Sequence, residues 1–322
     1  MKRFAHLVAP ALLMLHAASA AAQGFPSRPV TIIVPFPAGG VVDILARSIA
    51  DKMSAGLGQP VIVDAKPGAD SVIGTEAMLK APADGHTLLM ASPNIVTHEF
   101  MFPASRWTYA RDIAAIAYVA DVPNVAVVPA TLGPANLQEF VELAKKQPGK
   151  FNYASPGNGT SNHLGTELFQ QVTGIDMVKV TYKGQPPAIP DLLTNTIQFK
   201  LLTMSLAVPH VSSGKLRPLA VAATRRTRAL PDVPTFAEAG YPDVKVVPFF
   251  GLVTRKAAPA EVVARLNEEV RKALAQPEVA GRIEKANGEV AAPGSAADFD
   301  RFLAAESQKF GPLIRSRGIK SE

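Results

Sequence analysis

Short apolar runs alternate with longer amphipathic segments along most of the chain. Runs of this length, bounded by glycine, proline and polar residues, predict strands. The predicted strands are Val30–Val34, Val61–Asp64, Thr87–Ala91, Val125–Val128, Phe151–Ala154, Val178–Tyr182, Ile197–Thr203, Leu219–Ala223 and Val246–Thr254. Strands that alternate with helices are typical of an α/β fold with mainly parallel sheets.

The segments between these strands show the helical period, and their apolar stripes predict core faces. The stripes are Val42, Leu45, Ile49 and Met53, then Leu164, Leu168 and Val172, and finally Val263, Leu266, Val270 and Leu274. Two residue pairs at the capping spacing predict helix starts, and they are Asn136 with Glu139 and Ser295 with Asp298.

Two of the predicted strands end in a small, glycine-bearing loop that opens a helix. The first loop lies within Val30–Arg47 and the second within Phe151–Phe169. The first N–H groups of a helix have no intrahelical partner, and the helix dipole is positive at this end. Each loop can therefore hold an anion through its backbone, which glycine leaves open to close approach. The pair predicts two lobes that face one small anionic molecule.

The first 22 residues have the pattern of a secretory signal peptide. Two basic residues precede a mostly apolar stretch at 4–18, and small residues follow. We predict cleavage near Ala20 or Ala22 and export to the periplasm, because the apolar stretch is too short to span a bilayer. A retained membrane anchor is the alternative if cleavage fails.

Charge and cysteine content exclude several classes of function. Without residues 1–22 the chain keeps 31 of its 33 basic residues against 27 acidic ones, a net charge of +4. The basic residues are scattered except at Arg225-Arg226-Thr227-Arg228, which we interpret as a solvated loop, so nucleic-acid binding is not supported. The absence of cysteine excludes disulfides, thiolate nucleophiles and cysteine-based metal sites.

No motif for a cofactor or a catalytic centre is complete. The segment Gly157-Asn158-Gly159-Thr160-Ser161-Asn162 begins like a dinucleotide fingerprint, but Asn162 stands where the third glycine belongs. The chain also lacks three other motifs, which are the phosphate-binding GxxxxGK[ST], the zinc-binding HExxH and the GxSxG that carries a nucleophile. We predict no catalytic residue, no cofactor and no metal, while a Ser-His-Asp triad built from distant residues stays open.

Four polar residues stand next to these loops or at a neighbouring strand end. Asp43 is predicted to complement the helix dipole or to bind loop amides. The alternative is that it contacts an ammonium group of the ligand. His163 is predicted to brace its loop rather than to act as a general base. Ser92 and Asn94 follow a strand end, where open α/β sheets place their ligands.

Short motifs that occur together in one protein family run along the whole mature chain. They are Pro26-Ser27-Arg28-Pro29, Ile32 with Val34-Pro35-Phe36-Pro37-Ala38-Gly39-Gly40 and Asp43, Leu57-Gly58-Gln59-Pro60-Val61, Lys66-Pro67-Gly68-Ala69, Ala83-Asp84-Gly85-His86-Thr87-Leu88, Asn152-Tyr153-Ala154-Ser155, Gly157 to Leu164, Tyr182-Lys183-Gly184, Ser213-Gly214-Lys215-Leu216-Arg217, Leu230-Pro231-Asp232-Val233-Pro234-Thr235, Phe250-Gly251-Leu252 and Val263-Ala264-Arg265-Leu266-Asn267. Through this set the chain resembles the Bug-type periplasmic solute receptors, the binding components of tripartite tricarboxylate transporters.

The resemblance implies a two-lobed periplasmic-binding-protein fold of type II-like form, with a cleft between the lobes. It implies two interlobe crossings, near Val122–Pro129 and Val246–Thr254. Lobe 1 would then comprise residues 23–124 and 243–322, and lobe 2 residues 125–242. The breaker-rich or charged segments Pro129–Asn136 and Thr224–Pro234 are expected near the lobe junctions.

The resemblance also implies which residues meet the ligand, a small carboxylate in this family. One wall would consist of Pro37, Ala38, Gly39, Gly40, Ser92 and Asn94. The other wall would consist of Ser155, Asn158, Gly159, Thr160 and Ser161. Recognition in the family relies on backbone groups and ordered water, which agrees with two helix N-termini directed at one anion.

The chain departs from the family pattern at two places. Lys200 lies on a strand where the family carries acids, and it is predicted either to face the cleft or to lie on the surface. Ala69-Asp70-Ser71 replaces a run of small glycine-rich residues, which leaves the shape of that loop open.

Taken together, these features predict a monomeric receptor that is not an enzyme. It would close on a small carboxylate and deliver it to the membrane permease subunits of the transporter. A sensory receptor that hands its closed form to a signalling protein is one alternative. An exported α/β enzyme with the same cleft is another, and turnover of the bound carboxylate would reveal it.

Overall fold

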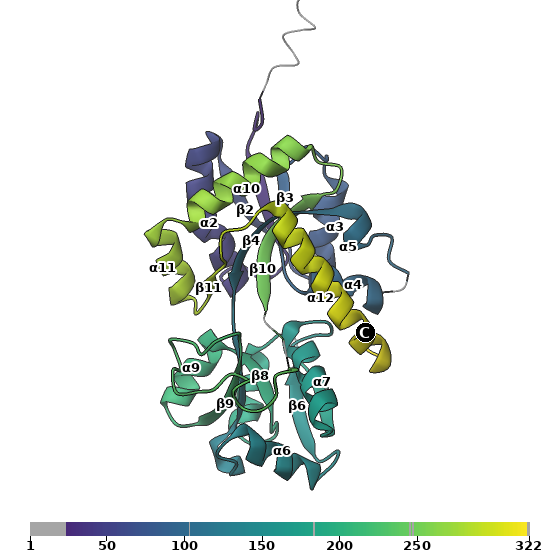
Figure 1. Ribbon diagram of the computed structural model, residues 1–322, viewed down its shortest axis with the longest axis vertical. Helices are drawn as coiled ribbons and strands as arrows, with labels where there is room; N and C mark the ends of the chain where they lie inside the picture. The colour runs from purple at the N-terminus through teal and green to yellow at the C-terminus, as the bar shows by residue number, and fades with distance from the viewer. Residues whose placement is uncertain (1–23, 103, 183, 245, 247, 321–322) are drawn as a thin grey trace, which may run out of the picture.

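The computed structural model describes residues 24–102, 104–182, 184–244, 246 and 248–320. The predicted signal peptide lies outside these residues. Figure 1 shows two groups of helices and strands, one above the other, joined by thin connections and by one long C-terminal helix. The predicted two-lobed α/β architecture is confirmed, but the prediction of mainly parallel sheets is wrong, because five of the eight pairings between the described strands are antiparallel.

Lobe 1 is built on a six-stranded mixed sheet. Its strands in spatial order are β11 (Glu289–Val290), β4 (Ile113–Asp121), β10 (Phe249–Arg255), β3 (Thr87–Ala91), β1 (Val30–Val34) and β2 (Val61–Ala65). Strands β2, β1 and β3 run parallel, whereas β10 is antiparallel to β3 and to β4. The carboxyl ends of β1, β2 and β3 therefore lie at one edge, where β10 begins.

Helices cover both faces of this sheet. One face packs against α2 (Val41–Leu57), α10 (Ala260–Leu274) and α11 (Pro277–Lys285). The other face packs against α3 (Val72–Lys80), α4 (Asn94–Met101), α5 (Tyr109–Asp112) and α12 (Ala296–Ser316). The predicted stripe on α2 is confirmed, because Val42, Leu45, Ile49 and Met53 are all buried. No helix in the described part of the chain is long and apolar enough to cross a membrane.

Lobe 2 contains a three-stranded sheet and a two-stranded sheet that meet at one bridge, Tyr153 with Phe199. The strands are β8 (Lys200–Thr203), β5 (Asn124–Pro129), β9 (Leu216–Ala222), β6 (Phe151–Ser155) and β7 (Met177–Thr181). The helices are α6 (Leu137–Lys145), α7 (Ser161–Thr173), α8 (Ile189–Leu193) and α9 (Met204–Ser212). Short 3₁₀ turns lie at η1 (Ala69–Ser71), η2 (Ala130–Leu132) and η3 (Pro186–Ala188).

Three segments connect the lobes. The chain enters lobe 2 at Val122–Pro123, between β4 and β5, and returns just before Phe249. Helix α12 starts on lobe 1 and descends to α7 of lobe 2 (Figure 1), where its last turn joins an apolar cluster with Met101 of α4 and Leu164 of α7. The tail beyond α12 thus touches lobe 2, whereas the boundaries at 124/125 and 242/243 stay a prediction.

The structure corrects several local predictions. The nine-residue strand β4 and the short strand β11 were not predicted, because alanine-rich IAAIAYVAD has a weak strand signal. Pro129–Asn136 follows the outward-running strand β5 and lies at the far end of lobe 2, not at a junction. The prediction that Val172 belongs to the buried stripe of α7 is wrong, because this residue is 38 % exposed. Both predicted capping pairs are confirmed.

Candidate functional site

The loops of lobe 1 that were predicted to bind a ligand share one edge of the sheet. Because β2, β1 and β3 are adjacent and parallel, the segments after them lie side by side. These segments contain Pro37–Gly40, Ala69–Ser71 and Ser92–Asn94. Open α/β sheets place ligands outside the carboxyl ends of their strands, as this edge would.

The first loop, Pro37–Gly40, is exposed and opens helix α2. Gly40 is the N-cap residue and offers no side-chain cap. Asp43 Oδ2 accepts a hydrogen bond from the Gly39 N–H at 3.1 Å and another from Arg47 Nε at 2.9 Å. The Arg47 guanidinium holds the pKa of Asp43 below its ordinary value. The prediction that Asp43 binds loop amides is confirmed.

Two polar atoms at this edge are buried and lack a hydrogen-bond partner in the described part of the chain. They are Asp43 Oδ1 and Ser92 Oγ. Buried polar groups are normally paired, so each is a group that a ligand or a bound water would satisfy. The third predicted residue here, Asn94, is already engaged, because its Nδ2 donates to the Asp70 carbonyl at 3.1 Å.

The loop after β2 has an unusual backbone. Ala69, Asp70 and Ser71 have φ angles of +46°, +49° and +78°, in the left-handed region that glycine occupies at no steric cost. This chain therefore keeps a left-handed turn without glycine there, at roughly 1 kcal/mol or more per residue. Such strain is concentrated at ligand-binding and switching segments in proteins.

The second loop, between β6 and α7, is largely buried and tied to itself. Ser155 Oγ donates to the Gly157 carbonyl at 3.1 Å, and Thr160 Oγ1 donates to the same carbonyl at 2.9 Å. Thr160 also caps α7, since its Oγ1 accepts from the His163 N–H. The N–H groups of Ser161 and Asn162 follow in the first helical turn, where no intrahelical acceptor exists.

Both polar atoms of the Asn158 side chain bind protein groups. Its Nδ2 donates to the Lys320 carbonyl at 2.7 Å, beyond the end of α12, and its Oδ1 accepts from Lys179 Nζ at 2.9 Å. The C-terminal tail was not predicted to reach this loop.

His163 braces the loop, as predicted. Its Nδ1 accepts a hydrogen bond from the Gly159 N–H at 3.3 Å. The ring is buried, 2 % exposed, and lies 3.9 Å from Glu167 Oε1 through Nε2.

Glu167 is the centre of a buried polar network that the sequence analysis missed. Its carboxylate accepts from Tyr153 Oη at 2.5 Å, Gln170 Nε2 at 3.2 Å and Arg317 Nε at 2.6 Å. The network ties β6 and α7 of lobe 2 to the residue that follows α12. Burial and the neighbouring carboxylate raise the pKa of Tyr153 well above its ordinary value, so its hydroxyl stays a donor. The polar residues at helical spacing in Ser161–Thr173 were the available signal.

The second loop also touches lobe 1. A Cβ atom at Gly157 would lie 2.8 Å from Asp70 Oδ1. A Cβ atom at Gly159 would lie 2.2 Å from Met101 Cε and 3.3 Å from Thr97 Oγ1, both on α4. A side chain at either position would displace the end of Asp70 or Met101, and it would also be strained, because Gly157 and Gly159 have φ angles of +141° and +70°.

Lys200 takes neither of its two predicted positions. Its side chain is 0 % exposed in lobe 2, and its Nζ donates to the Ala154 carbonyl at 3.4 Å. Burial lowers its pKa to about 7. The lysine therefore supports the end of β6, directly before the second loop, from within the lobe.

The arginine cluster of lobe 2 makes ion pairs with lobe 1. Arg225 lies 3.0 Å from Glu289 and Arg228 lies 3.2 Å from Glu284, while Arg226 pairs with Glu238 within lobe 2. A cavity of about 360 Å³ lies between these residues. The three arginines are exposed, as predicted, whereas Thr227 is buried, and the segment also bridges the lobes on the side of β9 and β11.

Comparison with known proteins places the whole chain in one group. Residues 45–319 match the model of the tripartite tricarboxylate transporter family receptor. The protein BugT of Bordetella pertussis is 35% identical over 308 residues, which are 94% of this chain and 94% of BugT.

Two solved structures of similar proteins contain carboxylates. The R. palustris protein Rpa4515 with adipate has a TM-score of 0.81 and 30% identity, covering 92% of this chain and 99% of that one. MatC from Rhodopseudomonas palustris with bound malate has a TM-score of 0.79 and 28% identity, covering 90% of this chain and 100% of that one.

Proposed function

Because the chain belongs to the tripartite tricarboxylate transporter receptor family, we propose that it binds a small dicarboxylate between the two glycine-bearing loops. Family and fold are those of a periplasmic solute receptor. Similar proteins hold adipate and malate, which supports a carboxylate ligand for this one. After binding, the closed receptor delivers the ligand to the membrane subunits of its transporter.

The observation that carries the proposal is the pair of helix N-termini at the facing edges of the lobes. Helices α2 and α7 both begin directly after a strand end, behind Gly40 and Thr160. Their first-turn N–H groups and dipoles favour a carboxylate without a basic side chain. The wall of lobe 1 would be Pro37, Ala38, Gly39, Gly40, Ser92 and Asn94, and that of lobe 2 Ser155, Asn158, Gly159, Thr160 and Ser161.

A ligand that contacts both walls shifts the equilibrium toward the closed form, because only that form offers both sets of contacts. The contacts of Gly157 and Gly159 with lobe 1 are of the kind that closure would stabilise. No covalent step is part of this function, and the receptor acts as a monomer. Residues 1–22 would be removed on export, near Ala20 or Ala22.

Thermal unfolding of the chain without residues 1–22 tests this proposal directly. Adipate, malate, citrate and a set of amino acids are each added at increasing concentration. A ligand at about one hundred times its dissociation constant adds roughly 2.7 kcal/mol of stability, which raises the melting temperature by several degrees. We expect a dicarboxylate to give the largest shift. Equal or absent shifts for all carboxylates would contradict the proposal.

A matched pair of variants locates the ligand. Gly40 has φ −74°, so Gly40→Val needs no left-handed backbone, and its bulk enters the exposed first loop. Gly281 on α11 has nothing within 4 Å of an added Cβ, so Gly281→Val is the control. The ligand-induced shift should disappear in Gly40→Val and persist in Gly281→Val. Turnover of the bound acid, followed by NMR, would instead support an enzyme.

A further inference from the structure

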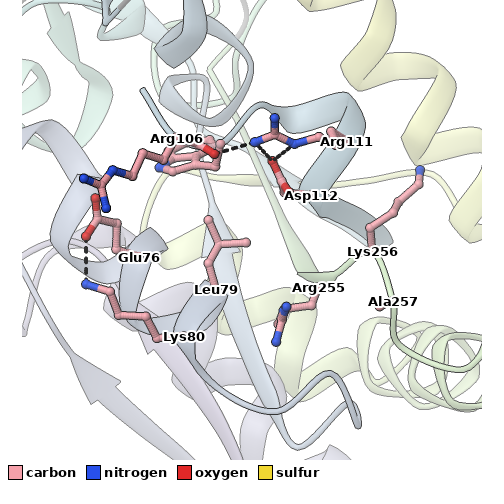
Figure 2. A pocket seen from close by; sticks show the side chains of 10 residues that line it. Glu76, Leu79, Lys80, Arg106, Arg111, Asp112, Arg255, Lys256 and Ala257 are labelled. Carbon is pink, nitrogen blue, oxygen red and sulfur yellow. Dashed lines mark hydrogen bonds and ion pairs between the residues drawn. The ribbon is translucent and has the colours of Figure 1, made fainter. Parts of the chain in front are cut away.

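Lobe 1 contains a second cavity, of about 550 Å³, away from the ligand loops. Strand β10 begins next to the crossing between the lobes and ends at Arg255, so the cavity lies at the opposite end of the sheet. Residues of α3, of the segment around α5 and of the end of β10 surround it (Figure 2). Its volume is within the range of small-molecule sites in proteins.

The cavity wall carries an excess of positive charge. Five basic residues and two acidic ones line it, and they are Lys80, Arg106, Arg111, Arg255, Lys256, Glu76 and Asp112. Both acids are already paired, because Glu76 lies 2.9 Å from Lys80 and Asp112 lies 2.9 Å from Arg111 (Figure 2). In the described part of the chain Arg106, Arg255 and Lys256 form no ion pair within 4.0 Å, although Arg255 is close enough to Asp112 to help lower the pKa of that carboxyl group.

The frame of the cavity is fixed by hydrogen bonds. Arg255 Nη1 donates to the Ala81 carbonyl at 2.8 Å, which orients its guanidinium. The Lys256 N–H donates to the Asp112 carbonyl at 2.8 Å, and Asp112 Oδ2 accepts from the Thr108 N–H at 2.9 Å. A ligand would therefore find these backbone positions already ordered, which lowers the entropy cost of binding.

Trp107 adds an aromatic wall with an unused donor. Its ring is 7 % exposed and stacks on His98, with 3.9 Å between the ring centroids. Its Nε1 is buried without an acceptor in the described part of the chain. A buried donor without a partner destabilises the fold, and an oxyanion would supply an acceptor oxygen.

We propose that this cavity binds a small oxyanion with at least two negative charges, independently of the ligand between the lobes. Arg106 and Lys256 provide charge that no protein carboxylate neutralises, and Arg255 provides a guanidinium of fixed orientation. Guanidinium groups match carboxylate and phosphate oxygens in pairs. The common chemistry of the ligand is its multiple oxyanionic charge, carried by phosphate or by carboxylate groups.

The chain offers a site-specific reporter, because Trp107 is its only tryptophan. Pyrophosphate and citrate are titrated separately into the chain without residues 1–22, and tryptophan emission is recorded. We expect a saturable change with at least one of them. Binding should weaken roughly tenfold between about 0.03 M and 0.3 M salt, because screening reduces the attraction. The two titrations distinguish phosphate from carboxylate chemistry.

Variants decide whether the change arises in this cavity. Arg106→Gln and Lys256→Gln remove side chains that make no hydrogen bond or ion pair in the described structure, so both should fold. Each is expected to weaken binding about three- to tenfold. Lys285→Gln, on the exposed side of α11, removes the same charge elsewhere and should change nothing. The proposal would be overturned if neither anion gave a saturable change in tryptophan emission. It would also be overturned if Arg106→Gln, Lys256→Gln and Lys285→Gln all bound the anion with the same affinity.

The experiment also separates this site from the proposed function. Gly40→Val should abolish stabilisation by the dicarboxylate and leave the emission response to pyrophosphate or citrate intact. Arg106→Gln should weaken the emission response to pyrophosphate or citrate and leave stabilisation by the dicarboxylate intact. A response lost in Gly40→Val but kept in Arg106→Gln would assign the oxyanion to the interlobe loops and refute the second site.

Discussion

The two glycine-bearing loops begin with the same local design and end in different surroundings. Pro37–Gly40 is exposed, and Asp43 supports it from its own helix. The loop at Ser155–Thr160 is mostly buried and contacts α4, η1 and the C-terminal tail. In the proposed site, the helix N-terminus of lobe 1 would thus be exposed, whereas that of lobe 2 would be held in place by distant segments.

This difference suggests a division of tasks in binding. In the proposed site the first loop would meet an incoming carboxylate at the surface, because Pro37–Gly40 is exposed, while the N–H groups of Gly39 and Gly40 already donate to Asp43 and to the Pro37 carbonyl. The buried loop is held by groups from both lobes, so it is sensitive to how the lobes are placed. Substitutions under the second loop should therefore have larger effects than matched substitutions under the first.

The largest effect is expected from Lys200→Met, below the second loop. Burial lowers the pKa of Lys200 to about 7, so the folded chain binds its proton less well than the unfolded chain does. Between about pH 7 and pH 10.5 the unfolded chain carries more of this proton, and stability rises with pH across that window. Below pH 7 the full cost of the buried charge remains, on the order of 4 kcal/mol.

Urea unfolding at pH 6.5 and pH 9.5 measures this contribution. Lys200→Met should be more stable than the parent at pH 6.5, and the gap should narrow at pH 9.5. Equal gaps at both pH values would mean that Lys200 does not titrate in this range.

The next effect is expected from Arg317→Met, which removes a cation from the buried carboxylate of Glu167. Breaking a buried ion pair costs about 3–5 kcal/mol, and we expect roughly 2 because Arg317 is 36% exposed. Arg47→Met is the matched change under the first loop, where the arginine is 54% exposed, and it should cost less than about 1 kcal/mol. The urea midpoints of unfolding give the loss of stability in each variant. Equal losses would show that the second loop is not held more firmly than the first.

A comparison of Gly159→Ala with Gly39→Ala separates the effect of interlobe contact on ligand affinity from the effect of backbone strain. Both glycines have positive φ, +70° and +78°, so the strain of an alanine is similar. An added Cβ meets Met101 at Gly159 but nothing within 4 Å at Gly39. We expect Gly159→Ala to weaken ligand binding about tenfold more than Gly39→Ala, measured by calorimetry. Equal affinities would show that the lobe contact does not contribute to the bound state.

The smallest effect is expected from Thr160→Ala, which removes the side-chain cap of α7. Loss of such a cap costs about 1 kcal/mol. Thr160→Ser keeps the hydroxyl and should restore most of the stability in thermal unfolding. Failure of serine to restore it would mean that the methyl group, not the cap, carries the effect. Helix α2 has no side-chain cap at Gly40, so the first loop has no counterpart to this variant.

The local features of the fold could be predicted because short-range physics determines them. The strand ends at Val34 and Ala91, the core face of α2 and the two capping pairs depend on residues within one or two turns of each other. The same holds for Asp43, which binds an amide four residues away.

Tertiary contacts decided the rest. Glu167 and Asn158 bind Arg317 and Lys320, and Gly159 lies against Met101; these three neighbours are distant along the chain, so no local pattern encodes the contacts. Strand β4 forms despite its alanines because β10 and β11 pair with it on both sides. Lys200 is buried because β5 and β6 lie beside its strand, which an alternation of residues cannot reveal.

By itself, the sequence determined two helix N-termini after two strands and the positions of most strands, and from these it predicted an anion receptor. The tertiary structure decided that the first loop is exposed and that the second loop packs against α4, α7 and the C-terminal tail. The reason is physical: backbone dipoles and capping act within a helical turn, whereas burial depends on which distant segments pack together.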